Sequence, residues 1–101
     1  RQVRKLLETE GYAVTRGAGS HGCADLWAAK LLQTVERDLI DLRLIQVKTD
    51  KSGPWANFRP KDRAELSALA AQTGGIAELW WHPARGKCRI YLEDSWPDGP
   101  G

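Results

Sequence analysis

A polar pair interrupts the apolar run in the middle of the sequence. Gln46 and Lys48 stand two residues apart, so their side chains leave the same face if this segment is a strand. Leu42 and Leu44 share that face, so its inner part is core and its end turns polar. An unpaired ammonium there is costly. Asp25 opens the preceding apolar segment, and hairpin pairing of the two segments would bring its carboxylate close to the pair.

These residues allow two interpretations. The simpler one is an ion pair between Asp25 and Lys48 that serves the fold alone. The other is a hydrolytic metal site, because Mg²⁺ takes oxygen ligands, commonly one or two carboxylates completed by waters and phosphate oxygens. Asp25 offers a carboxylate, Gln46 an amide oxygen and Val47 its backbone carbonyl. Such a cation lowers the pKa of a bound water and stabilises charge on a phosphate, and Lys48 would hold that water or neutralise that charge.

The elements that must position these residues follow the order α-β-β-β-α-β-β. Helical spacing of Val3, Leu6 and Leu7 predicts a first helix in which all three are buried. We expect strands over residues 12–16, 25–32, 39–49, 76–81 and 88–93, and a helix from Pro60 to the glycine pair 74–75. The segment 39–49 is apolar on both faces, which is typical of a central strand. This order predicts a mixed five-stranded α/β sheet flanked by helices.

Composition indicates one soluble globular domain. The chain has 101 residues, of which 42% are hydrophobic and 28% charged. No apolar run approaches the roughly 20 residues of a membrane helix, so we expect no membrane association. We expect a single domain over residues 1–96 and a flexible tail over 97–101. Two cysteines are too few for a disulfide framework, which favours a reducing, cytoplasmic compartment.

The charge of the chain is unevenly distributed. Residues 1–61 hold eleven Lys/Arg and seven Asp/Glu, a balance of +4, whereas residues 62–101 hold four and six, a balance of −2. A basic half suggests an anionic partner such as nucleic acid, although an ordinary solvated surface gives the same balance. The predicted phosphate contacts are Arg1, Arg4, Lys5, Arg16, Ser20, His21, Lys51, Arg59 and Lys61.

Two adjacent tryptophans bear on assembly. Trp80 and Trp81 lie in one strand segment, so they point to opposite faces. We expect one beneath a helix and the other, with Ile90 and Leu92, at a two-fold dimer surface. The alternative is that Trp81 is covered by its own chain.

Three stretches resemble the archaeal-type Holliday junction resolvases of the PD-(D/E)xK nuclease superfamily: EGYAVTRGAGS at 10–20, ADLWA at 24–28 and LIQVKT at 44–49. The match runs from residue 1 to about 51, and the segment 66–79 fits the same pattern. The resemblance implies a restriction-endonuclease-like fold. It further implies a homodimeric endonuclease that makes paired symmetric nicks in four-way DNA junctions, with Mg²⁺ (Mn²⁺ as a substitute) and no organic cofactor.

The resemblance also implies roles for particular residues. Asp25 matches the metal-binding aspartate of the family and Lys48 its catalytic lysine. Arg16 and Ser20 match an arginine and a serine near the scissile phosphate. Hydrolysis is expected to be direct attack by water, because no Ser/His or Tyr relay is visible.

The sequence departs from the family pattern in its carboxylates. Gln46 stands where most members have Glu, which removes a negative charge and should weaken metal binding. The family also has a Glu immediately before the position that matches Arg1, and the sequence begins at Arg1. Two other functions therefore stay open. One is a nickase of the same superfamily that acts on other branched or duplex DNA, and the other is a catalytically weakened junction-binding protein.

Overall fold

The computed structural model describes residues 2–17 and 24–97 of the chain. In chain order the elements are α1 (Gln2–Thr9), β1 (Ala13–Arg16), β2 (Leu26–Gln33), β3 (Asp38–Lys48), α2 (Pro60–Thr73), β4 (Ile76–Trp81), β5 (Arg89–Leu92) and a short 3₁₀ turn (Glu93–Ser95). Among these residues no helix is long and apolar enough to cross a membrane. The expected element order is confirmed, with bounds that move by one or two residues, and the 3₁₀ turn is an addition.

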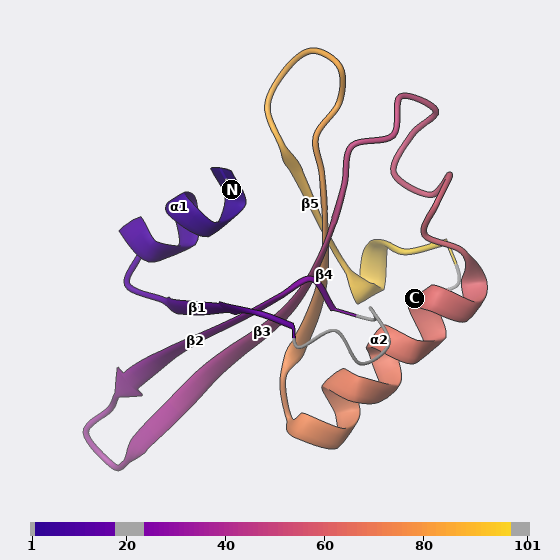
Figure 1. Cartoon of the computed structure of the whole chain (residues 1–101). Coiled ribbons are helices and arrows are strands. Elements are labelled where there is room, and N and C mark those ends of the chain that lie inside the picture. The colour runs from indigo at the N-terminus through magenta and orange to yellow at the C-terminus, as the bar shows by residue number, and fades with distance from the viewer. Residues whose placement is uncertain (1, 18–23, 98–101) are drawn as a thin grey trace.

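The strands form one mixed sheet in the order β1-β2-β3-β4-β5. Neighbours pair antiparallel except β3 and β4, which run parallel. A parallel pair needs a long crossover, and α2 supplies it. Figure 1 shows α1 and α2 on opposite faces of the sheet, so the mixed five-stranded sheet flanked by helices that the sequence predicts is confirmed.

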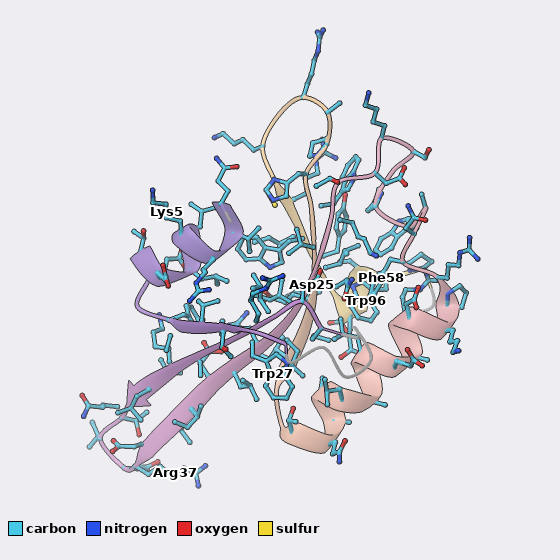
Figure 2. All side chains as sticks on the ribbon, in the orientation of Figure 1. Lys5, Asp25, Trp27, Arg37, Phe58 and Trp96 are labelled. Carbon is cyan, nitrogen blue, oxygen red and sulfur yellow. The ribbon has the colours of Figure 1, made fainter. Side chains whose placement is uncertain are left out.

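Each face of the sheet has its own core. On the α2 side Leu44 packs with Phe58, Leu66 and Trp96, and Figure 2 shows Phe58 and Trp96 side by side there. On the α1 side Ile45 packs with Val3, Leu7, Leu26 and Trp80, among others. Leu44 and Ile45 are adjacent on β3 and both 0% exposed. The central strand is therefore buried on both faces at this point.

The prediction that Val3, Leu6 and Leu7 are all buried is wrong for Leu6. Leu6 is 50% exposed, whereas Val3 and Leu7 are buried. The helix α1 is short and turns only a narrow stripe toward the sheet. Val3 and Leu7 are four residues apart and occupy that stripe, which leaves Leu6 at its rim.

The tryptophan pair also differs from the expected dimer surface. Trp80 is the buried one, and the β4–β5 register pairs it with Ile90. Opposite residues of an antiparallel pair share a face, so Ile90 and Leu92 lie on the side of Trp80. Trp81 points to the other face, where its indole N–H donates to the Asp50 carbonyl at 2.8 Å. Trp81 therefore does not join Ile90 and Leu92 in one surface.

The outer half of the β2–β3 hairpin extends beyond its neighbours. Pairing with β1 reaches Ala29 of β2, and pairing with β4 begins at Arg43 of β3. Residues 30–33 and 38–42 therefore form a two-stranded ribbon, with Arg37 in the turn at its tip (Figures 1 and 2). Leu31 and Ile40, paired on the ribbon, are 51% and 65% exposed. The prediction that β3 is apolar and buried on both faces is therefore correct only for the inner half of this strand.

A polar network crosses the α1 face of the sheet. The Tyr12 hydroxyl and the Arg43 Nε each donate to the Asp41 carboxylate at 2.7 Å. Arg43 also donates to Glu78 at 2.5 Å, and the Trp80 indole N–H donates to the same carboxylate at 2.8 Å. Glu78 is only 4% exposed, so these partners compensate the cost of burying its charge. The Arg43 guanidinium lowers the pKa of Asp41, and hydrogen bonding to Asp41 in turn raises that of Arg43.

We expect Asp41→Asn to lower the free energy of unfolding by about 2 kcal/mol near neutral pH, because charge-assisted hydrogen bonds are lost. The pKa of Asp41 is lower in the folded state. Its stabilising effect is therefore complete above its ordinary pKa of about 4 and disappears as the pH falls through the folded value. Urea unfolding of both proteins at several pH values measures this, and the two curves should converge in acid.

The matched control is Asp38→Asn, which makes the same change at the exposed first residue of β3. This variant should unfold within about 0.5 kcal/mol of the parent protein. An equal loss in both variants would contradict the importance of the network.

Candidate active site

The Asp25 carboxylate is held at the point where β2 begins. The Asp25 backbone N–H donates to the Ile45 carbonyl at 2.8 Å, and the Val47 N–H donates to Asp25 Oδ2, also at 2.8 Å. The side chain thus continues the pairing of β3 one step beyond Leu26, the first residue of β2. Asp25 is labelled near the centre of Figure 2, where the described strands converge. The expected approach of Asp25 to the polar end of β3 is therefore seen.

Gln46 carries a buried polar atom that has no hydrogen-bond partner among the described residues. The residue is 8% exposed, and its Oε1 accepts no hydrogen bond from the described part of the chain. The regular pairing of β2 with β3 ends at Leu26 and Ile45, and Gln46 follows directly after this last pair. Gln46 leaves the sheet on the side of Leu44, two residues before it. A buried carbonyl without a donor is expensive, and it is typical of a position where a ligand binds.

Lys48 is the last residue of β3 and lies on the same face as Gln46. It is half-buried, and its backbone carbonyl accepts a hydrogen bond from the His82 N–H at 2.9 Å. Among the described residues there is no salt bridge between Lys48 and Asp25. The interpretation of Asp25 and Lys48 as a structural ion pair therefore finds no support. The carboxylate is bonded to the backbone of Val47 instead.

Gly17 directly follows β1 and was not among the predicted site residues. Its N–H donates to the Asp25 carbonyl at 2.8 Å. A Cβ built on Gly17 would lie 2.0 Å from the Ala24 carbonyl oxygen, so no side chain fits between the two segments. The signal available in the sequence was a glycine directly after a short strand.

Among the described residues, Arg16 is not brought to this point. Arg16 pairs with Leu26, whose side chain packs in the α1-side core, so the described strands do not bring Arg16 to the face of Gln46 and Lys48. Its proposed role stays a prediction. Arg1, Ser20 and His21 lie outside the described residues.

The other predicted phosphate contacts divide between the two sides of the sheet. Arg4 and Lys5 are exposed on α1, where Arg4 forms an ion pair with Glu8 at 3.2 Å, and Figure 2 shows Lys5 on this helix. Lys51, Arg59 and Lys61 are exposed in the segment after β3 and at the start of α2. The structure therefore separates these cations into two groups.

The donor set suits a weakly held hard cation. Among the described residues no three His, Cys, Asp or Glu side chains cluster in a way that could hold a metal ion. Mg²⁺ needs fewer protein ligands than that, because it commonly binds through one or two carboxylates and keeps several waters. The Asp25 carboxylate, the Val47 carbonyl and the unpartnered Gln46 Oε1 provide oxygen atoms of the right kind. The residues present therefore fit such a cation.

We expect Asp25→Ala to lower the free energy of unfolding by about 1 kcal/mol, because the Val47 N–H loses its acceptor. Asp25→Asn should stay close to the parent protein, since an amide oxygen accepts the same hydrogen bond. Urea unfolding of the three proteins measures both effects. Equal stability of the Ala and Asn variants would contradict a structural role for this hydrogen bond.

Comparison with known proteins bears on the fold. No protein-family model and no curated protein matches the sequence. Among solved structures, that of the Holliday junction resolvase Hjc from the archaeal hyperthermophile Archaeoglobus fulgidus is similar, with a TM-score of 0.69 and 23% identity. The match covers 91% of this chain and 74% of that one. The resemblance found in the sequence is thus confirmed at the level of the fold: this chain has the fold of an archaeal Holliday junction resolvase.

Proposed function

We propose that the chain is a metal-dependent endonuclease that resolves four-way DNA junctions by paired symmetric nicks. The observation that carries this proposal is the polar end of β3. The Asp25 carboxylate accepts a hydrogen bond from the Val47 N–H, the Gln46 Oε1 is buried with no donor among the described residues, and Lys48 follows on the same face as Gln46. The proposal is supported by the fold, which the chain shares with a Holliday junction resolvase.

Each residue would contribute one chemical group to the reaction. The Asp25 carboxylate and the Gln46 and Val47 oxygens would hold Mg²⁺, with Mn²⁺ as a substitute. When bound, the ion lowers the pKa of a water and neutralises charge on the phosphate. The Lys48 ammonium, half-buried at the end of β3, would stabilise the negative charge that develops on the phosphate oxygens.

A homodimer belongs to the same proposal. Two symmetric nicks lie on two strands, so they need two sites related by a two-fold axis. On the α1 side, Leu6, Ile90 and Leu92 are each 46% to 50% exposed. These exposed apolar residues of the α1 side, without Trp81, are our candidates for the dimer interface.

Cleavage of an end-labelled four-way junction tests the function. With Mg²⁺ or Mn²⁺ the parent protein should make paired, symmetric nicks. Asp25→Asn should reduce the cleavage rate at least about a hundredfold, because a charged ligand is lost while the hydrogen bond from Val47 remains. The structural control is Asp38→Asn, which should cut like the parent protein.

Linear duplex DNA and flap DNA, tested beside the four-way junction, distinguish a resolvase from the alternative functions. Equal cutting of linear duplex or flap DNA would replace the resolvase with a nickase of the same superfamily. Tight junction binding without cleavage would support a junction-binding protein, which the neutral Gln46 favours. Cleavage that persists in Asp25→Asn would contradict the assignment of the site to the end of β3.

Metal binding without DNA tests the role of Gln46. We expect Gln46→Glu to bind Mn²⁺ at least about tenfold more tightly, because a second negative charge then faces the cation. Burial of that charge should also lower the melting temperature in the absence of metal, and added Mn²⁺ should restore it. Calorimetric titration and thermal unfolding measure the two effects.

The matched control is Gln72→Glu, the same change at an exposed position of α2. This variant should match the parent protein in both measurements. If Gln46→Glu gains no affinity for Mn²⁺, Gln46 does not face the cation.

A further inference from the structure

The turn between β4 and β5 carries a group of cations that are not among the predicted phosphate contacts. Residues 82–88 connect the two strands, and Figure 1 shows this turn projecting beyond the end of β3. Arg85 and Lys87 flank Gly86, whose φ of 97° reverses the chain at the tip. Arg89 follows at the start of β5. All three cations are exposed.

No acidic residue offsets this charge nearby in the sequence. Between Glu78 and Glu93 there is no Asp or Glu. None of the three cations forms a salt bridge with a described residue. By contrast, Arg4 and Arg43, which lie on other elements, are paired with carboxylates. The cations of the turn are therefore available to an external anion.

The base of the turn is fixed beside the candidate active site. The His82 N–H donates to the Lys48 carbonyl at 2.9 Å, and the Trp81 indole donates to the Asp50 carbonyl at 2.8 Å. The turn thus leaves the sheet at the end that holds Asp25, Gln46 and Lys48. Asp50 is the acidic residue at this base, and its carboxylate is engaged by the Ser52 N–H and the Asn57 amide. Its charge is therefore partly compensated within its own loop.

We propose that Arg85 and Lys87 bind the sugar-phosphate backbone of a DNA arm as it leaves the active site. The proposal rests on the proposed function, and it adds a contact that neither the motifs nor the shared fold assigns. Exposed cations on a turn contact phosphates without reading bases. The turn would therefore hold the arm by charge and shape rather than by sequence, as recognition of a junction requires. Lys51 is exposed in the loop whose Asp50 carbonyl accepts the hydrogen bond from Trp81 at the base of the turn.

Salt dependence of junction binding tests this proposal. Each neutralised phosphate contributes a slope of about −0.9 to the plot of log K against log salt. Arg85→Gln should lower the steepness of the slope by about one, and Arg85→Gln with Lys87→Gln by about two. At about 0.1 M salt the affinity should fall roughly tenfold for each residue, equally for junctions of different sequence. Fluorescence anisotropy with uncleaved junction in the absence of divalent metal measures these values.

The matched control is Arg37→Gln, the same substitution in the turn of the β2–β3 ribbon, at the far end of the sheet (Figure 2). Its slope should equal that of the parent protein. Equal slopes for Arg85→Gln and Arg37→Gln would overturn the proposal while leaving junction binding intact. If the parent protein bound no junction DNA at all, the proposed function would fail, and this contact would fail with it. Melting temperatures confirm that the variants are folded.

Discussion

The pairing of β2 with β3 is the constraint on which the candidate site depends. A shift of one residue in a hairpin register turns every side chain to the opposite face. Here such a shift is blocked from both sides, because Leu44 belongs to the α2-side core and Ile45 to the α1-side core. The same register places Asp25 at the level of Gln46 and Val47. Packing of apolar residues on two faces therefore determines where the carboxylate lies.

The carboxylates of Asp41 and Glu78 differ from that of Asp25 in the kind of partner that they have. On the α1 face, Asp41 and Glu78 share the guanidinium of Arg43, so their charge is compensated within the fold. Asp25 has the backbone N–H of Val47 as its partner and forms no salt bridge with a described residue. Its charge therefore remains available to a ligand. The buried Gln46 Oε1 on the same strand end, which has no donor among the described residues, is consistent with such a position.

Local patterns predicted the elements and the proximity of Asp25 to the polar end of β3, because alternation and hairpin pairing are short-range effects. They did not predict features set by tertiary packing. The helical stripe of α1 could not show that Leu6 is left at the rim, and adjacent tryptophans could not show which face Ile90 shares. Gly17 is required because its backbone lies against the carbonyl of Ala24, seven residues further along the chain. Charge summed over half the chain concealed Arg85 and Lys87, which lie in the half with negative balance.

The unequal lengths of the strands have a consequence for local stability. Over its eleven residues β3 runs from an isolated ribbon, which begins at Asp38, to the middle of the sheet, where Arg43, Leu44 and Ile45 pair with both β2 and β4. Amide protons in the ribbon are exposed by fraying of a single hairpin, whereas those near Ile45 exchange only when most of the sheet opens. One continuous strand thus spans a wide range of opening free energies. The polar residues at its inner end follow directly after this doubly paired segment, so we expect motion of the ribbon to leave their arrangement unchanged.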